Sequence, residues 1–356
     1  MRKHLVRAVL LGLSVAVGTG AYGPAEAASH QKAKKHPATV AAKTPAKATK
    51  TAKTEKGEKS RKLARSAKTG AKLALAGSAA VVTHHAIRHA SAAPDDLGAA
   101  RRLAVQSSAA MVLDQSSGEV IYQKNASSIM PIASISKLMT AMVVLDSKPD
   151  MSAPITIAAS DVDTLRNSRS RLPVGTVLTR EHAMLLALMS SENRAAHALA
   201  RSYPGGLRAF VDAMNRKARS LGMNETHFED PTGLTSNNVS TAADLAKMVA
   251  AAHNYSQIRD FTTTSGATVE IHGRVEEFHN TNALIRNHNS AWDIGLSKTG
   301  YIQEAGKCLV MQARVAEKPV VIVLLDSAGA MTRIGDAQRI KHWMESASLG
   351  RRSSPV

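Results

Sequence analysis

Three apolar runs near the C-terminal end place the strongest constraint on the fold. They are "GLSKTGYI", "KCLVMQARVA" and "KPVVIVLLDSA", and short turns separate them. Apolar runs of this length joined by short turns predict strands that pair as antiparallel neighbours. A helix is predicted to follow them at "TRIGDAQRIKHWMESA". The end of the folded part should therefore be a sheet covered by a helix.

The preceding part contributes one more pair of strands and then helices. "AAMVLDQSSGEVIYQKNA" alternates apolar and polar residues around a Ser-Gly turn, which is typical of a β-hairpin. Helical patterns follow at 131–146 and 178–200, and at "GGLRAFVDAMNRKARSLGM" and "STAADLAKMVAAAHN". Thr179 and either Ser240 or Thr241 are the expected N-caps. Strands at both ends with helices between them predict an α+β domain whose antiparallel sheet joins its two ends.

Charge divides the chain at about Leu97. The residues before it include 18 lysines and arginines against five acidic residues, whereas the rest has 28 against 23. The formal net charge of +18 therefore belongs mainly to a leader. Residues 28–96 are rich in Lys and Ala without a hydrophobic period, which predicts a disordered tether. Two interpretations stay open: attraction to an anionic envelope polymer or membrane surface, or a spacer kept soluble by charge.

Residues 1–27 have the pattern of a secretory signal peptide. A positive start precedes the apolar run "AVLLGLSVAVG", which is too short to span a bilayer, and the small-residue pattern "AEA" follows it. We expect cleavage after Ala27 and export from the cytoplasm. The single cysteine, Cys308, excludes a disulfide framework and is expected to be a core thiol.

A lysine interrupts the most apolar of the predicted helices. "PIASISKLMTAMVVLD" places Lys137 among Ile, Leu, Met and Val, where a charged amine costs free energy unless it has a partner or a task. Ser134 should lie one turn earlier on the same helix face, whereas Ser136 is expected to be incidental. Burial lowers the pKa of an amine, and a neutral lysine can accept a hydroxyl proton. The structural alternative is a capping serine with a snorkelling lysine.

Two further polar motifs interrupt apolar segments. Ser191–Asn193 ("SEN") follows the apolar run "LLALMS", and Lys298–Gly300 ("KTG") lies inside a predicted strand, where Lys and Gly are both unfavourable. S-x-x-K, S-x-N and K-T-G in this order are the signature of serine penicillin-recognising enzymes. Each motif alone is weak evidence, but the ordered triple is specific.

With these motifs the chain resembles the low-molecular-weight penicillin-binding proteins, the D-Ala-D-Ala peptidases of serine peptidase family S11. "DPTGLTSNNVSTAADLAKM", "NTNALIR" and "SKTGYIQEAGKCLVMQA" also look like that family in its order. The resemblance covers about residues 109–347 and is nearest to the D-alanyl-D-alanine endopeptidase branch. It implies a β-lactamase/D,D-peptidase-like fold in which helices flank the antiparallel sheet and a mostly helical subdomain is added. The catalytic domain would occupy 97–348, followed by a tail at 349–356.

The resemblance implies a catalytic role for several residues. Ser134 would be the acyl-enzyme nucleophile, and Lys137 would be the base that activates it. Ser191 would relay a proton to the leaving amine with the help of Lys298. The backbone N–H groups of Ser134 and Tyr301 would form the oxyanion hole. Water would then hydrolyse the acyl-enzyme, and no metal or organic cofactor is required.

It also implies how substrate binds. Asn193 would bind the amide carbonyl, Lys298 and Thr299 would hold the acidic end, and Gly300 would let the substrate backbone lie along the strand. The positive charge of Lys298 would also lower the pKa of Lys137. The implied partners are peptidoglycan stem peptides and cross-links, with β-lactams as covalent inhibitors and no specific nucleic acid. The implied location is the periplasm or cell envelope of a bacterium.

Several activities fit such a site. Endopeptidases of the family cut D-Ala–diaminopimelate cross-links, and carboxypeptidases remove a terminal D-Ala from stem pentapeptides. The expected lack of a second β-rich domain and of an anchor helix favours an endopeptidase, with a D-Ala-D-Ala carboxypeptidase as the alternative. A β-lactamase needs a further carboxylate, and the pair Glu276 and Asn280 lies too close to Lys298 in the sequence. If the protein were a non-enzymatic envelope-binding protein, we would expect at least one of the three motifs to be damaged. All three motifs are intact in this sequence.

Three expectations concern the surroundings of the motifs. Glu192 is expected to face solvent, although it lies between two motif residues. Asp230–Gly233 is expected to form a turn near the rim of the site. Trp292 either packs in the core or lines the substrate groove.

Overall fold

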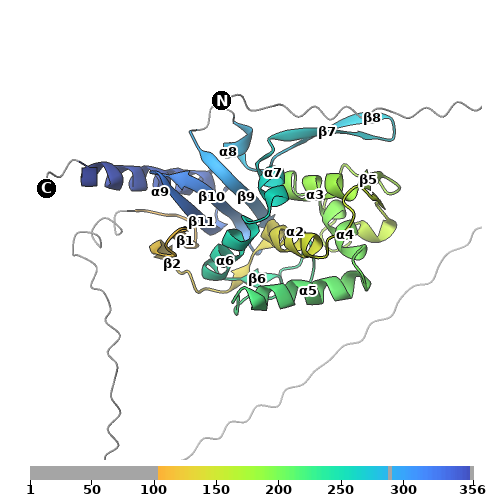
Figure 1. Cartoon of the computed structure of the whole chain (residues 1–356), viewed down its shortest axis with the longest axis horizontal. Helices are drawn as coiled ribbons and strands as arrows, with labels where there is room; N and C mark the ends of the chain where they lie inside the picture. The colour runs from red at the N-terminus through yellow and green to blue at the C-terminus, as the bar shows by residue number, and fades with distance from the viewer. Residues whose placement is uncertain (1–102, 288–290, 353–356) are drawn as a thin grey trace, which may run out of the picture. The chain divides into compact units, whose positions relative to one another are not determined.

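Five strands form the central sheet, in the order β2-β1-β11-β10-β9 with every neighbouring pair antiparallel. The computed structural model describes residues 103–287 and 291–352, so the expected signal peptide and leader lie outside the described residues. The first two strands of the folded part and its last three meet in this sheet (Figure 1), as the sequence predicted. The strands are β1 (Ala109–Asp114), β2 (Val120–Lys124), β9 (Asp293–Ile302), β10 (Gly306–Val315) and β11 (Lys318–Ser327).

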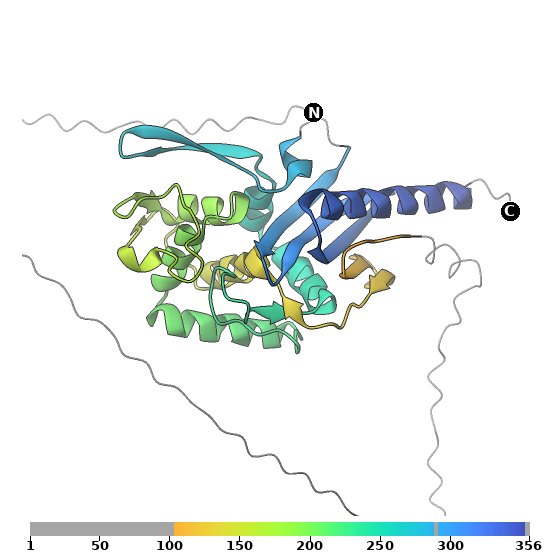
Figure 2. The same ribbon diagram turned by 180° about the vertical axis from the view of Figure 1, so that it is seen from behind.

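Successive strand residues point to opposite faces of the sheet, and the alternation creates two apolar cores. In β1, Ala109 and Met111 belong to the larger core, whereas Ala110 and Val112 belong to the smaller one. Helix α9 (Ala330–Arg352) covers the smaller core and continues past residue 348. On the opposite face, α6 (Ala242–Ala252) packs against β1, β10 and β11, and α7 (Ser256–Thr263) packs against β9. The remaining long helices belong to the larger core and lie to one side of the sheet (Figure 2).

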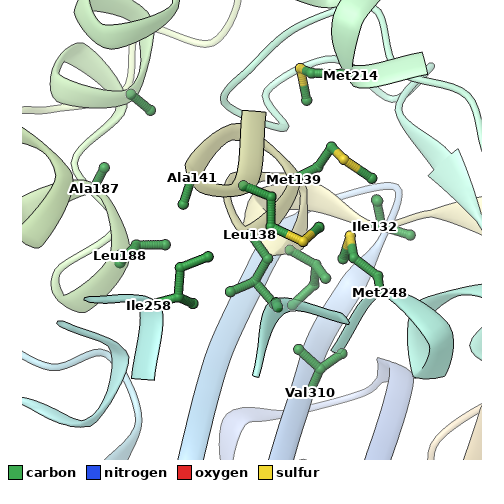
Figure 3. Packing of buried hydrophobic residues seen from close by; sticks show 14 of the residues in the cluster. Ile132, Leu138, Met139, Ala141, Ala187, Leu188, Met214, Met248, Ile258 and Val310 are labelled. Atoms are coloured by element: carbon green, nitrogen blue, oxygen red, sulfur yellow. The ribbon is translucent and has the colours of Figure 1, made fainter. Parts of the chain in front are cut away.

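The larger core is built around helix α2, which carries the S-x-x-K lysine. Figure 3 shows Leu138 and Met139 of this helix among apolar side chains from neighbouring helices and from the sheet. Unbranched methionine fills irregular gaps between such elements. The helices of this side are α2 (Ser136–Asp146), α3 (Arg180–Met189), α4 (Asn193–Arg201), α5 (Gly206–Ser220), α6 (Ala242–Ala252) and α7 (Ser256–Thr263).

Both predicted N-caps are confirmed, but two predicted helices are shorter than expected. The hydroxyls of Thr179 and Thr241 each accept a hydrogen bond from the backbone N–H three residues later. The run at 178–200 is two helices, because Ser191 has a left-handed φ of 63° that ends the helical path. The run at 131–146 becomes α-helical only at Ser136 and is preceded by the 3-10 turn η1 (Ala133–Ile135).

Smaller elements complete the domain. The hairpin of β7 (Gly266–Ile271) and β8 (Arg274–His279) was not predicted and extends along the helical side (Figures 1 and 2). In the described ranges each helix is too short or too polar to cross a bilayer. The short elements are β3 (Met130–Pro131), β4 (Pro154–Thr156), η2 (Ala159–Asp161), β5 (Val177–Thr179), β6 (Val239–Ser240) and α8 (Ala283–Arg286).

A buried carboxylate ties η2 to helix α4. Asp161 accepts hydrogen bonds from His197 Nδ1 at 2.7 Å and from Arg201 Nε at 2.9 Å, and its side chain is fully buried. Burial raises the pKa of Asp161, but the hydrogen bonds from His197 and Arg201 outweigh it and lower the pKa to about 2. His197 and Arg201 lie on α4, which begins at Asn193 of the S-x-N motif. Their hydrogen bonds to Asp161 therefore hold this helix in place.

Replacing this carboxylate should destabilise the domain. We expect Asp161→Ala to lower the free energy of unfolding by about 2–4 kcal/mol, because the Arg201 guanidinium and the His197 ring lose a buried acceptor. Asp293→Ala, which removes the exposed ion pair with Arg314, should cost less than about 1 kcal/mol. The stability that Asp161 contributes is present above its ordinary pKa of 3.8 and is lost as the pH falls through about 2. Urea unfolding at several pH values measures the loss of stability in each variant and its pH dependence. Equal losses in the two variants would contradict the stabilising role of Asp161.

Candidate active site

The amine of Lys137 is the centre of the site and is completely buried. Its Nζ donates to three acceptors: Ser134 Oγ at 2.8 Å, Asn193 Oδ1 at 2.7 Å and the carbonyl of Thr232 at 2.6 Å. An ammonium has three donors, so these acceptors satisfy it completely. The lysine therefore joins the turn before α2, the start of α4 and the Asp230–Gly233 turn.

Burial determines the charge of this lysine. It lowers the pKa of Lys137 to about 7, although the carboxylates of Asp230 and Glu192 act in the opposite direction. The amine is therefore partly neutral at neutral pH. We expected burial, with repulsion from Lys298 in addition, to lower this pKa. Burial is the main effect at Lys137, and the repulsion is seen in Lys298, whose pKa is lowered by burial and by the charges of Lys137 and Arg333.

Ser134 lies on the 3-10 turn η1, and its hydroxyl is within reach of proton transfer to Lys137. The serine is half-buried, whereas Ala133 and Ile135 on either side are fully buried. Ser136, which we expected to be incidental, is structural. Its hydroxyl donates to the carbonyl of Ala133 at 2.9 Å and accepts from Asn238 Nδ2 at 2.9 Å, so it fixes the turn.

The second lysine of the site contacts the S-x-N motif from the sheet. Lys298 is 1% exposed, and its Nζ donates to Ser191 Oγ at 2.9 Å and to the carbonyl of Thr299 at 2.9 Å. Next to it, the Thr299 hydroxyl donates to Thr281 Oγ1 at 2.7 Å. Tyr301 is 56% exposed, and the amine of Lys307 lies over its ring. The edge strand β9 therefore contributes the sheet side of the site.

Two glycines let other segments of the chain pack closely against the turn of Ser134. A Cβ at Gly300 would lie 2.9 Å from the carbonyl oxygen of Ile132 and 3.2 Å from the backbone nitrogen of Ser134. A Cβ at Gly233 would lie 1.9 Å from the carbonyl oxygen of Ala133. We expected Gly300 to make room for substrate. The structure adds that it makes room for the turn itself.

Sequence reasoning missed or misjudged several neighbours. Glu192 does not face solvent: it is 7% exposed and accepts a hydrogen bond from Ser170 Oγ at 2.6 Å. The Asp230–Gly233 turn does more than line the rim, because its Thr232 carbonyl binds Lys137. Ser168 Oγ accepts from Asn193 Nδ2 at 3.0 Å. These partners are backbone groups or residues distant in the chain, and the local pattern carries no signal for them.

The other residues of the sequence analysis have structural positions. Trp292 packs against the α9 core, and its ring lies 5.9 Å from the amine of Lys341. Cys308 is buried as predicted, and burial raises the pKa of its thiol to about 11. Asn280 donates to the carbonyls of Thr262 and Thr264 at 2.9 Å each.

Among residues 103–287 and 291–352, no three His, Cys, Asp or Glu side chains are grouped to hold a metal ion.

The close packing at Gly233 predicts a selective loss of stability. Gly233→Ala should lower the free energy of unfolding by about 3 kcal/mol or more, because the methyl group meets the backbone of Ala133 and φ is +80°. Gly118→Ala is the matched control, since its φ is +74° but nothing lies within 4 Å of the added Cβ. It should cost about 1 kcal/mol. Thermal and urea unfolding measure the loss of stability in both variants. Equal losses would show that the turn of Ser134 does not require the close approach of Gly233 to Ala133.

Comparison with known proteins places the chain in a family. Residues 96–329 match the model of peptidase family S11, described as D-alanyl-D-alanine carboxypeptidase. A D-alanyl-D-alanine endopeptidase of Pseudomonas aeruginosa is 45% identical over 72% of this chain and 83% of its own length.

Solved structures agree with the fold. The Streptomyces K15 DD-transpeptidase is 28% identical, with a TM-score of 0.63 over 68% of this chain and 98% of its own. Penicillin-binding protein D2 of Listeria monocytogenes, in its ampicillin-bound form, is 27% identical, with a TM-score of 0.57 over 68% of this chain and 98% of its own. The expected α+β fold of the D,D-peptidases is thereby confirmed, and the chain belongs to serine peptidase family S11.

Proposed function

We propose that the protein is a D,D-endopeptidase that hydrolyses D-Ala–diaminopimelate cross-links of bacterial peptidoglycan through an acyl-enzyme at Ser134. One observation carries this proposal: the buried amine of Lys137 lies 2.8 Å from Ser134 Oγ and has a pKa of about 7. A base whose pKa is near the operating pH is best suited to take up and return a proton.

The first step forms the acyl-enzyme. Neutral Lys137 accepts the proton of Ser134 while Oγ attacks the carbonyl carbon of the D-alanyl bond. The backbone N–H groups of Ser134 and Tyr301 stabilise the oxyanion. As the tetrahedral intermediate collapses, the carbon–nitrogen bond breaks and the proton that Lys137 took from Ser134 passes through Ser191 to the leaving amine, with the help of Lys298. Lys137 is then neutral again for the second step. The contact between Ser191 Oγ and Lys298 Nζ supports this relay.

The second step is hydrolysis. Water attacks the ester carbonyl and gives a proton to neutral Lys137, which returns it to Ser134 Oγ as that bond breaks. A β-lactam would acylate the same serine but lose its ester slowly, which makes it a covalent inhibitor.

Substrate binding uses the polar groups that face the nucleophile. Asn193 binds the amide carbonyl of the donor stem, while Lys298 and Thr299 hold the carboxylate beside the scissile bond. Gly300 lets the substrate backbone lie along β9. Burial and the charges of Lys137 and Arg333 lower the pKa of Lys298, and a substrate carboxylate would oppose this effect, because opposite charge favours the protonated amine. An acidic substrate would therefore favour the protonated form of the lysine that assists the leaving amine.

The endopeptidase assignment follows the relative that is 45% identical. The D-Ala-D-Ala carboxypeptidase remains the second candidate, because the family model carries that description. Export to the periplasm or cell envelope fits a peptidoglycan substrate and the signal-peptide pattern of residues 1–27. The lysine-rich leader at 28–96 would then contact anionic envelope polymer or membrane surface.

Covalent labelling tests the nucleophile. Intact-protein mass spectrometry after incubation with benzylpenicillin should show one added antibiotic on the wild type and none on Ser134→Ala, with the acylation rate reduced at least about 1000-fold. Ser136→Ala is the matched control, because this serine lies two positions away and binds only protein groups. It should still be labelled. Labelling of Ser134→Ala at the wild-type rate would refute the acyl-enzyme at this residue.

Purified muropeptides separate the two candidate activities. We expect the protein to convert cross-linked dimers to monomers and to leave a monomeric pentapeptide unchanged, with both mixtures analysed by mass spectrometry. Ser134→Ala should convert neither, which serves as the control for contaminating hydrolases. Loss of one D-Ala from the pentapeptide with dimers intact would show a carboxypeptidase that uses the same site.

A further inference from the structure

Glu192 is a buried carboxylate that the reaction described above does not use. It lies between Ser191 and Asn193 and is 7% exposed. A buried carboxylate costs free energy unless hydrogen bonds or opposite charge compensate it. Ser170 Oγ donates to it at 2.6 Å, and Arg171 Nε lies 3.5 Å from its other oxygen. The side chain does not cap α4, although Glu192 is the N-cap residue of that helix.

Arg171 connects this carboxylate to the β7–β8 hairpin. Its Nη1 donates to the carbonyl of Glu277 at 2.6 Å, and its guanidinium lies 4.1 Å from the centre of the Phe278 ring. Phe278 is fully buried, so the arginine is held by a fixed part of the fold. One guanidinium thus joins the S-x-N turn to the hairpin.

The segment that carries these partners also holds the other side of the motif. Ser168 accepts the hydrogen bond of Asn193 Nδ2, and the carbonyl of Leu172 accepts from Arg194 Nη1 at 2.8 Å. Residues 168–172 therefore contact the S-x-N turn at Glu192, Asn193 and Arg194. These contacts leave the Asn193 oxygen directed to the amine of Lys137.

Ser191 gives a reason for so many contacts. Its φ of 63° lies in the left-handed region, which costs a non-glycine residue about 1–2 kcal/mol. Such a conformation persists only where the surroundings fix it. The hydroxyl that receives the hydrogen bond of Lys298 is oriented by this backbone conformation.

We propose that Glu192 is a positioning residue that fixes Ser191 and Asn193 for acylation. This role rests on the acyl-enzyme proposed above. Glu192 contacts its two neighbours only through the chain, and it acts by anchoring the turn to Ser170 and Arg171. It also adds negative charge near Lys137, where Asp230 has the same sign and Lys298 the opposite sign.

Three substitutions separate anchoring from charge. Glu192→Gln keeps an oxygen that can accept from Ser170 but removes the charge. Ser170→Ala removes the hydrogen bond and keeps the charge. Glu192→Ala removes both. Asp212→Asn is the matched control, because it removes an exposed carboxylate on α5, away from the site.

The measured quantity is the second-order rate constant for acylation by a labelled penicillin, from about pH 5 to about pH 9. For the wild type we expect a limb that rises with pH and has its midpoint near 7, because the neutral amine is present above its pKa. Glu192 raises the pKa of Lys137, so Glu192→Gln should move this limb to lower pH. A purely structural role would leave the limb in place.

Glu192→Ala should lower the maximum rate at least about tenfold, because a displaced turn moves catalytic groups out of line. Ser170→Ala should lower the rate without moving the limb, and Asp212→Asn should behave as the wild type. Unfolding midpoints are recorded for every variant. If Glu192→Ala does not fold, Glu192→Gln and Ser170→Ala decide the question.

The result that overturns the proposal is an unchanged limb in Glu192→Gln together with wild-type rates in Glu192→Ala and Ser170→Ala. That outcome, with the wild type acylated at Ser134, would leave the proposed function intact. A wild type that is not acylated at Ser134 would instead refute the proposed function itself.

Discussion

The three hydrogen bonds of the buried Lys137 amine hold the catalytic part of the molecule together. They connect helix α2, the start of α4 and the Asp230–Gly233 turn. A fully buried ammonium would be costly, and this environment reduces the cost by lowering the pKa of the amine to about 7. The lysine is therefore a structural junction, and it is also the base of the proposed mechanism. Burial, which costs free energy, is thus the main cause of the lowered pKa on which the proposed mechanism depends.

The fold supports this junction by bringing the main chain of two other segments close to Ser134. Gly300 in the edge strand and Gly233 in the opposite turn both face the 3-10 turn of Ser134, where a side chain would collide with backbone. The sheet supplies one wall because its edge strand, β9, carries the K-T-G motif. The helical side supplies the other wall through the S-x-N turn. The turn η1, the S-x-N turn, the Asp230–Gly233 turn and strand β9 are thereby held together around the hydroxyl group of Ser134.

The sequence predicted the parts of this arrangement that have a periodic or motif signal. The last three strands, β9 to β11, are nearly continuous apolar runs because both of their faces are buried, and this pattern predicted them. The β7–β8 hairpin was missed because only one residue of each strand is buried, Ile271 in β7 and Phe278 in β8, so the apolar signal is weak. The burial of Glu192 was missed because its partners, Ser170 and Arg171, lie more than twenty residues earlier. The Thr232 carbonyl has no side-chain signature at all.

The charge of Lys137 can be measured directly. We would titrate the protein with its lysine side chains labelled with carbon-13 and assign the Lys137 resonance by its absence in Lys137→Met. The account predicts a resonance that titrates near pH 7 and is lost in that variant. A Lys137 resonance that titrates near the ordinary lysine value of 10.5 would contradict it, because the amine would then be fully charged when the serine must lose its proton.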